Sequence, residues 1–358
     1  MKKVKLGQLV SIQTGKLDAN AAVFGGKYPF FTTAKEISRI NEYAYDGEVV
    51  LVAGNGDLNV KYYKGKFNAY QRTYILTSNS NVRMKYLYYF LDKYIEVLRY
   101  QSIGGVIKYI KLNNLSDAQI PMRSIFEQDK IIGILEKLDN EIIIRSKQLS
   151  ELSNLVKSRF NEMFGDIFDN PQSKLEDHIE LNPNKKELQN FNGNVSFLPM
   201  SNVSENGKID LSINRNIDDV RKGFTFFKDN DVIVAKITPC FENGKGAPVF
   251  GLLNGVGFGS TEFHVLRPKN TVNTVWLYHV TMLSKFRLEG ERKMTGSGGQ
   301  RRITKDFINN FKLNIPPLSL QNEFADFVDQ VDKSQLAIQK SLEELETLKK
   351  SLMQEYFG

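Results

Sequence analysis

The stretch RSKQLSELSNLVKSRFNEMFG at residues 145–165 returns as IQKSLEELETLKKSLMQEYFG at residues 338–358. When the two are aligned without a gap, 10 of the 21 positions are identical. Self-similarity of this kind identifies an internal repeat, which constrains the architecture before any single helix or strand is assigned. The chain therefore contains the same sequence framework twice, and we refer to this repeated part as the frame.

The repeat continues upstream of these two stretches, more loosely. The matched positions are Gln128 with Gln321, Asp139 with Asp332, Ile120-Pro121 with Ile315-Pro316, Gly104-Gly105 with Gly298-Gly299, and Lys5-Leu6 with Lys174-Leu175. Between these positions the two halves share almost no similarity. We therefore predict two unlike globular segments, residues 1–123 and 166–318, and two repeated helical segments, residues 124–165 and 319–358.

Both repeated segments are expected to be long helices. The motif S-I-F-E at residues 124–127 has the form of a capping box, Pro121 and Pro316 prevent an earlier start, and Gly165 is a suitable stop. Each helix then spans about 35–40 residues, on the order of 55 Å. Apolar residues recur at alternating steps of three and four, the spacing of a coiled-coil seam. The predicted seam consists of Leu135, Leu138, Ile142, Leu149 and Leu152 in the first helix and Val328, Val331, Ile338, Leu342, Leu345 and Leu352 in the second.

Two arrangements can cover such a stripe. Each helix can pack on the core of its own domain, which is the commoner case in general, or the two helices can pair with each other. Two copies with the same period favour pairing, and the whole domain between them favours an antiparallel coiled coil.

The globular segments read as mixed α+β. Short β-rich runs at residues 48–53, 72–76, 231–237 and 262–266 alternate with turn signals at Asp46-Gly47, Asn55-Gly56, Asn206-Gly207 and Asn243-Gly244. Helices are predicted at residues 86–100 and around residues 275–288. The tyrosines of the first of these helices suit nucleobase stacking, but their helical spacing among leucines is more typical of a core. They are Tyr88, Tyr89, Tyr94 and Tyr100.

Composition excludes several classes of protein. The chain has 358 residues, 41% of them hydrophobic, which is enough to bury more than one core. No window approaches 18 uncharged apolar residues and no signal peptide is recognisable, so we expect a soluble, cytoplasmic protein. The single cysteine, Cys240, and three scattered histidines lack metal-ligand spacing, so neither an internal disulfide nor a structural metal is expected.

The positive charge is concentrated in the globular segments. Residues 1–123 contain 18 Lys and Arg against 9 Asp and Glu, and residues 166–318 contain 20 against 17. The helical segments are acidic, with 6 against 7 at residues 124–165 and 4 against 8 at residues 319–358. If the polyanion that a net charge of +7 suggests is DNA, the globular segments are the parts that touch it.

Recognisable catalytic equipment is missing from the sequence. It contains no G-x-x-x-x-G-K-[ST] phosphate loop. Asn182-Pro183-Asn184-Lys185 lacks the second proline and the aromatic of an adenine-methyltransferase N-P-P-[FY] loop. The Gly-rich runs at residues 24–26 and 257–259 read as turns, and we find no acid-acid-lysine nuclease cluster. A non-catalytic protein is therefore expected.

In this order and in duplicate, the motifs resemble the specificity-subunit family of type I restriction-modification systems over essentially the whole chain. The resemblance is carried by I-P-M-R-S-I-F-E-Q from Ile120 and I-P-P-L-S-L-Q from Ile315, by the leucine-rich helices ending in F-G, by the glycine turns before Ile-Pro, and by G-S-T-E-F-H-V-L-R-P from Gly259. The dissimilar stretch of the first half is about 25 residues shorter than that of the second half, and its sequence departs from the motifs common in the family.

The resemblance implies two target-recognition domains, each reading one half of a split DNA sequence, with the paired helices acting as a ruler between half-sites. Its implied partners are double-stranded DNA, two methyltransferase subunits and the restriction-translocase subunits. S-adenosylmethionine, ATP and Mg would belong to those partner subunits, with no cofactor on this chain. The half-sites and the spacer length are not readable from the sequence.

Candidate DNA-contacting residues are basic or amide side chains near loops, because such groups contact phosphates and base edges. A single exposed Lys or Arg is more often a solvated surface charge. The run from Arg292 to Arg302 is a stronger candidate because its two basic pairs flank a Gly-rich loop. The candidates are Lys61, Lys64, Lys66, Gln71, Arg72 and Lys108 in the first domain, and Lys236, Lys245, Arg292, Lys293, Gln300, Arg301 and Arg302 in the second.

Three alternatives remain open at this point. The chain can be an intact restriction-methylation fusion, against which the missing motifs argue, or an assembly adaptor that does not bind DNA, against which the charge distribution argues. The third is the recognition subunit of a related bipartite type II system, which only partner composition would distinguish.

Overall fold

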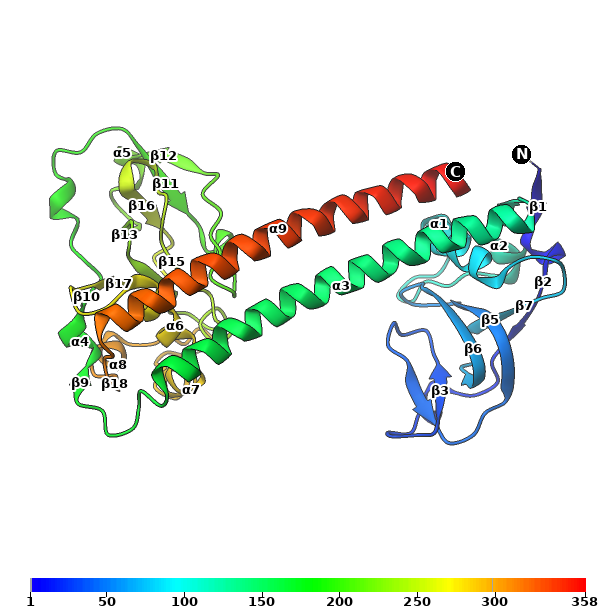
Figure 1. Ribbon diagram of the computed structural model, residues 1–358, viewed down its shortest axis with the longest axis horizontal. Coiled ribbons are helices and arrows are strands. Elements are labelled where there is room, and N and C mark those ends of the chain that lie inside the picture. Colours follow the sequence, from blue (N-terminus) through cyan, green and yellow to red (C-terminus); the bar gives the residue numbers. More distant parts are fainter. Residues whose placement is uncertain (1, 298) are drawn as a thin grey trace. The chain divides into compact units, whose positions relative to one another are not determined.

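The computed structural model describes residues 2–297 and 299–358 and divides the chain into two compact units. Unit 1 consists of Met1–Gln148 with Ile338–Gly358, and unit 2 is Leu149–Ala337. The long helices α3 (Ile125–Phe164) and α9 (Leu318–Phe357), drawn in Figure 1, are each divided between the two units. The matched Gly298 lies outside the described residues.

The sequence signals at both ends of α3 are confirmed. Glu127 Oε2 accepts hydrogen bonds from the N–H (2.9 Å) and hydroxyl (2.7 Å) of Ser124, and Ser124 Oγ accepts one from the Glu127 N–H (3.3 Å). This is the reciprocal capping box. Gly165, with φ at 59°, ends the helix, and its N–H donates to the Asn161 carbonyl at 2.9 Å. A left-handed residue directly after the last turn is the usual helix stop.

Inside each unit the segments of α3 and α9 run antiparallel to each other. In unit 1, Asp139 from the first half of α3 pairs with Lys349 near the end of α9 at 2.6 Å. In unit 2, Phe160 near the end of α3 packs on Phe324 near the start of α9, with ring centroids 5.4 Å apart. The start of one helix meets the end of the other in both cases. All eleven predicted seam residues, from Leu135 to Leu352, are buried or half-buried.

Unit 1 is built on a six-stranded sheet of order β2-β7-β5-β6-β3-β4 (Figure 1), in which only the β3–β6 pair is parallel. Alternate residues of β5 face two different apolar clusters, as the pleat requires. Val50 and Val52 pack with α1, whereas Val49 and Leu51 pack with Phe67 on the other face. The elements are β2 (Val10–Thr14), β3 (Tyr28–Phe31), β4 (Ser38–Ile40), β5 (Tyr45–Ala53), β6 (Val60–Ala69), β7 (Thr73–Ser78) and α1 (Met84–Gln101).

Unit 2 contains two four-stranded sheets, of order β10-β17-β14-β15 and β12-β11-β16-β13. Helix α6 packs against the first sheet, where Trp276 and Leu277 are fully buried with Val232 and Val234. The elements are β10 (Ile179–Leu181), β11 (Asn194–Leu198), β12 (Asn214–Asn216), α5 (Ile217–Val220), β13 (Thr225–Lys228), β14 (Val232–Ala235), β15 (Gly246–Pro248), β16 (Val256–Gly259), β17 (Phe263–Pro268), α6 (Thr274–Met282) and α7 (Ser284–Arg292).

Each unit closes its globular part with the same short ladder. In unit 1, β1 (Lys3–Lys5) pairs with β8 (Gln119–Pro121), and the Leu6 N–H donates to the Ala118 carbonyl at 2.9 Å. In unit 2, β9 (Ser173–Lys174) pairs with β18 (Lys312–Leu313), and the Leu175 N–H donates to the Phe311 carbonyl at 2.9 Å. The short helices α2 (Leu112–Ser116), α4 (Leu175–His178) and α8 (Lys305–Asn309) complete this frame.

The ladders correct one sequence match. Lys5 lies opposite Gln119, and the equivalent Lys174 lies opposite Lys312, so Ile120 corresponds to Leu313. The match of Ile120-Pro121 with Ile315-Pro316 was therefore wrong by two residues. A constant shift of 193 residues relates α2 to α8 and α3 to α9. The repeat is continuous from residue 112 to residue 164.

Two buried glutamines connect the frame to the domains. Gln128 accepts a hydrogen bond from the Arg83 N–H at the start of α1 (3.0 Å), and its amide donates to the Arg123 carbonyl (2.9 Å). The equivalent Gln321 accepts from the Asn273 N–H at the start of α6 (2.8 Å) and donates to the Pro316 carbonyl (2.8 Å). Both side chains are fully buried. Each thus accepts a hydrogen bond at a helix N-terminus, where backbone N–H groups have no partner within the helix.

Most predicted elements are confirmed, and two turns are not. All four β-rich runs overlap strands, and residues 86–100 lie within α1. Asp46-Gly47 lies inside β5, where Gly47 pairs with Gly65, and residues 257–259 lie in β16. A side chain at Gly257 would meet the Phe227 ring at 2.2 Å, so this glycine serves close packing in a strand and not a turn.

Candidate nucleic-acid interface

Two loops occupy the same place in the two units. In unit 1 the loop after α1 is closed by a bridge in which the Ile103 and Tyr109 backbones exchange hydrogen bonds of 3.0 and 2.9 Å. In unit 2 the loop after α7 is closed by Thr295 and Arg302, with bonds of 3.0 and 2.8 Å. We refer to residues 103–109 as the first loop and to residues 295–302, apart from residue 298, as the second loop.

Both loops are anchored to the turn that follows a central strand. In unit 1 the Gly56 N–H donates to the Lys108 carbonyl and the Ile110 N–H to the Gly54 carbonyl, each at 2.9 Å. In unit 2 the Thr238 N–H donates to the Arg301 carbonyl and the Ile303 N–H to the Lys236 carbonyl, also at 2.9 Å. The loop residues in these bonds keep the shift of 193 residues, whereas the turn residues that they meet are related by a shift of 182. Lys108 and Arg301 therefore occupy equivalent positions.

The first loop exposes apolar side chains beside its lysine. Val106 is fully exposed, with 103% relative accessibility, and Ile107 is 62% exposed. Lys108 is exposed as well and forms no ion pair among the described residues. Its anchoring turn also receives the Arg72 carbonyl, to which the Gly54 N–H donates at 2.8 Å. The structure thus brings the predicted residues Arg72 and Lys108 to the same turn of unit 1, whereas the N–H of Gln71 donates to the Leu17 carbonyl at 2.8 Å.

In the second loop the two arginines differ. Arg302 is paired with Glu262 through three contacts, of which the shortest joins Nη2 to Oε1 at 2.8 Å. This hydrogen bonding lowers the pKa of Glu262. Arg301 is exposed and lies 3.9 Å from Glu242, a long contact for an ion pair. Arg302 therefore braces the loop against the end of the sheet, whereas Arg301 and its neighbour Gln300 are accessible.

The other candidates are scattered over their units. Lys61 is half-buried and donates to the Ala34 carbonyl at 2.7 Å and to the Asn59 side chain, and Lys245 donates to the Met200 carbonyl at 3.3 Å. The Lys66 ammonium lies over the Tyr43 ring at 4.6 Å. Lys236 is half-buried beside the second loop, and Lys293 lies over the Phe307 ring. Lys64 and Arg292 are exposed.

Sequence reasoning overlooked the apolar tip of the first loop. The signal was present, since Val106-Ile107 directly follows Gly104-Gly105, where a loop is usually polar. Of the tyrosines considered for stacking, Tyr88, Tyr89 and Tyr94 pack in or against the core. Tyr100, 93% exposed at the end of α1, is the exception and lies close in sequence to the first loop.

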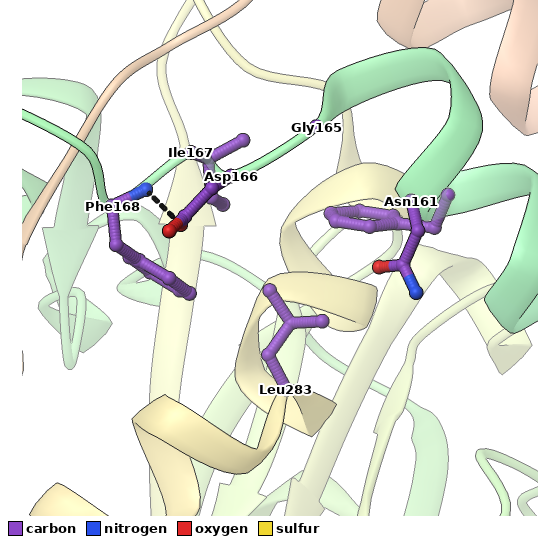
Figure 2. A pocket seen from close by; sticks show the side chains of 7 residues that line it. Asn161, Gly165, Asp166, Ile167, Phe168 and Leu283 are labelled. Carbon is purple, nitrogen blue, oxygen red and sulfur yellow. Dashed lines mark hydrogen bonds between the residues drawn. The ribbon is translucent and has the colours of Figure 1, made fainter.

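A hollow in unit 2 is lined mainly by apolar side chains, among them Phe160, Ile167, Phe168 and Leu283. The hollow has a volume of about 280 Å³. It lies at the end of α3, and Figure 2 shows Phe168 and Leu283 on its wall. Its charged side chain, Asp166, accepts a hydrogen bond from the Phe168 N–H at 2.9 Å. Within residues 2–297 and 299–358 there is no group of three metal-ligating side chains, and no helix there is long and apolar enough to cross a lipid bilayer.

The structure thus defines the class of two-domain proteins built on an internal repeat, in which the two unlike domains carry loops at equivalent positions. The chain belongs to the family described as the type I restriction modification DNA specificity domain, whose model matches residues 1–154 and 172–348. The expected family resemblance is thereby confirmed, and with it the α+β fold with an internal repeat.

Known relatives carry type I names. The EcoDI specificity subunit of Escherichia coli is 39% identical over 161 residues, which is 45% of this chain and 36% of that protein. The EcoAI subunit of the same species is 41% identical over 145 residues, 40% of this chain and 24% of that protein. The alignments thus span about a quarter to a third of these relatives. The MjaVIII subunit of Methanocaldococcus jannaschii is 22% identical, over 98% of this chain and 90% of that protein. The type II alternative is not favoured.

Solved structures share the fold. A type I restriction-modification S subunit from M. genitalium superposes with a TM-score of 0.65 at 15% identity, covering 100% of this chain and 96% of that one. A chain from a study of assembly and conformational transition of the type I system gives a TM-score of 0.54 at 14% identity, covering 99% and 97%.

Proposed function

We propose that this chain is the DNA-recognising specificity subunit of a type I restriction-modification enzyme, in which each globular domain reads one half of a bipartite target. The observation that carries the proposal is the duplication of one frame around two unlike domains. Equivalent positions of that frame present an exposed cation, Lys108 in unit 1 and Arg301 in unit 2. A reader of two different half-sites needs this combination of a constant support and a variable surface.

DNA is the partner that the charges favour. The excess of basic residues is nine in residues 1–123 and three in residues 166–318, while both helical segments are acidic. Phosphate contacts supply affinity without sequence information, and base contacts in the grooves supply the specificity. We therefore assign DNA contact to the globular domains and partner contact to the helices.

The helices carry matched apolar side chains that no core covers. Ile143 and Leu348 are exposed in unit 1, and Leu336 and Leu155, their equivalents at the 193-residue shift, are exposed in unit 2. A surface repeated in this way suits two copies of one partner. We infer that two methyltransferase subunits dock here, with restriction-translocase subunits joining for cleavage.

Catalysis and cofactors are assigned to those partners. The sequence lacks a phosphate loop and an adenine-methyltransferase loop, so S-adenosylmethionine, ATP and Mg would be bound by the other subunits. The chain would select the DNA and hold the methyltransferases over it.

The test is to purify the full chain with and without its methyltransferase partner and to assay adenine methylation of plasmid DNA. The complex is expected to methylate a split target found by methylome sequencing, and the chain alone to bind DNA with a salt-dependent affinity but to transfer no methyl group. Methyl transfer by the chain alone, or a complex that binds no DNA, would refute the proposal.

A further inference from the structure

The tips of the two loops carry different chemistry at equivalent positions. The second loop is one residue longer than the first, but when both are counted back from their closing residues, Tyr109 and Arg302, the shift of 193 residues that matches Lys108 with Arg301 also matches Ile107 with Gln300. We propose that Ile107 and Gln300 are base-reading residues at equivalent positions of the two domains, and that Lys108 and Arg301 contact the adjacent DNA phosphates. The inference rests on the proposed function and adds to it which chemical feature each domain reads.

The first loop is built to hold its tip away from the core. Its base is closed by the Ile103–Tyr109 bridge and anchored to Gly54 and Gly56. Gly104 has φ at 118°, and a side chain there would meet the Ile107 carbonyl at 2.6 Å, so the tight turn requires glycine. A collapsed loop would cover its apolar residues, but Val106 and Ile107 remain exposed. The closed base and the tight turn of the loop therefore keep these two side chains exposed.

An exposed isoleucine beside an exposed lysine is better suited to contact with DNA than to exposure to solvent. Ile107 has no hydrogen-bonding group, and the apolar feature on a base edge is the thymine methyl group in the major groove. Lys108, with no ion pair within the described part of unit 1, is available to a phosphate. We therefore expect the first domain to read a thymine at the position that the loop reaches.

The second loop offers a hydrogen-bonding reader at the same position. The Gln300 amide has both a donor and an acceptor, the pair that adenine matches with N7 and its amino group. Arg302 is engaged with Glu262, whereas the ion-pair contact of Arg301 among the described residues is the one with Glu242 at 3.9 Å. Arg301 is thus the arginine available to DNA. The second domain is expected to read an adenine where Gln300 reaches it.

The test uses the full chain in complex with its methyltransferase, after the wild-type target has been determined by methylome sequencing. Ile107→Ser is compared with Leu112→Ser, which changes an apolar residue that is 51% exposed in the same unit but outside the loop. Gln300→Ala is compared with Gln189→Ala, an exposed glutamine elsewhere in unit 2. Thermal denaturation and size-exclusion chromatography verify folding and assembly of each complex.

Each loop variant is expected to weaken binding to the target duplex by about tenfold and to relax one base position in its own half-site only. Binding to a scrambled duplex should change little. Lys108→Gln and Arg301→Gln should instead weaken both duplexes and reduce the salt slope by about one.

Unchanged specificity in both Ile107→Ser and Gln300→Ala would overturn the inference while leaving the proposed function intact. Loss of methyltransferase assembly in Ile107→Ser would also overturn it, because the tip would then be a protein contact. A wild-type complex without salt-dependent DNA binding would instead overturn the proposed function.

Discussion

Gln128 and Gln321 each connect a long helix to a helix of the globular domain that precedes it in the chain. Gln128 connects α3 to α1, and Gln321 connects α9 to α6. Each side chain is fully buried, and each satisfies an N–H at a helix start and a carbonyl beside its own helix. A buried polar group that loses its partner costs about 1–3 kcal/mol. The two glutamines are therefore expected to stabilise the attachment of both domains to the frame.

Gln128→Ala and Gln321→Ala should each lower the free energy of unfolding by about 1–3 kcal/mol or more, since the first removes two hydrogen bonds to backbone groups and the second removes three. Differential scanning calorimetry of the full chain measures this as a lower Tm. Gln119→Ala, at an exposed position of β8, is the matched control and should leave Tm nearly unchanged. Equal Tm values for Gln128→Ala and Gln119→Ala would refute the role of the buried bond.

Asp92 and Asp129, both in unit 1, should respond to pH with opposite sign. Burial, together with the negative charge of Asp139, raises the pKa of Asp92, although Lys349 opposes this. The hydrogen bond from Arg83 lowers the pKa of Asp129. A raised folded-state pKa means that the ionised Asp92 carboxylate destabilises the fold at neutral pH, and that this penalty disappears as the pH falls below its folded-state and then its unfolded-state pKa.

Asp92→Asn is therefore expected to be more stable than the wild type at pH 7, and Asp129→Asn less stable. The Asp92→Asn difference should shrink as the pH falls through the raised folded-state pKa of Asp92 and approach zero below about 4, where the unfolded-state carboxyl becomes protonated. The Asp129→Asn difference should begin to shrink only at about pH 4 and disappear below the lowered folded-state pKa of Asp129. Urea unfolding at a series of pH values from neutral to below the lowered pKa of Asp129 measures both. A destabilised Asp92→Asn at pH 7 would mean that the Lys349 attraction outweighs burial.

At the residue level, the sequence predicted equivalent positions where the same residue recurs in both halves. It did not predict roles that depend on contacts in the folded structure. The match of Gln128 with Gln321 was visible, but its hydrogen bonds depend on helices far away in the chain. Arg301 and Arg302 are adjacent and chemically identical in the sequence, and only the position of Glu262 separates a bracing arginine from an accessible one. Contacts between distant segments cannot be read from local patterns.

At the scale of elements, α3 and α9 are proposed to set the spacing between half-sites. Four residues inserted after Leu149 add about 6 Å of rise and turn the helix by about 400°, close to one full turn. The recognised spacer should then lengthen by one or two base pairs, at about 3.4 Å each, or the protein should fold poorly because the seam loses its match.

Methylome sequencing of a host that carries the variant with its partner subunits measures the spacer. The control is the same insertion after Gly25, an exposed turn of unit 1, which should leave the spacer unchanged. A well-folded helix variant that keeps the original spacing would show that another part of the complex sets the distance.

Element prediction was accurate for the helices because several independent signals coincide at their ends. Ser124, Glu127 and Gly165 mark α3 by local chemistry alone. Strand register carries no such local signal, so the Ile-Pro pairs were aligned two residues away from the correspondence that the ladders define. The glycines of β16 were predicted to form a turn because the local sequence does not show why glycine is needed there. The need arises from close packing against Phe227, a residue distant in the sequence.

For the whole molecule, exchange of residues 1–123 for the corresponding domain of a related subunit should change one half of the recognised sequence. The other half and the spacing should persist, because unit 2 has its own cores and its own loop. Methylomes of hosts carrying the parent and the exchanged chain provide the measurement. A shift in both halves would contradict independent readout.

The duplicated architecture was predictable because repetition is a property of the sequence itself. The sheets inside each domain were not, since their strands are short and their order, such as β2-β7-β5-β6-β3-β4, follows from pairings across long stretches of chain. The loops that we propose as readers were predicted in part, through Lys108 and Arg301. Their equivalence became apparent only from matching backbone hydrogen bonds.

The short ladders at the ends of each domain have a genetic consequence. Chain enters and leaves each domain at one spot, between Leu6 and Ala118 in unit 1 and between Leu175 and Phe311 in unit 2. The intervening stretches differ in length and sequence, yet the frame is the same. A single recombination event with breakpoints in the codons of β1 and β8 can therefore install a foreign insert without a compensating mutation elsewhere. Under the proposed function, such a gene would acquire a new DNA target, and a host a new restriction barrier, in one step.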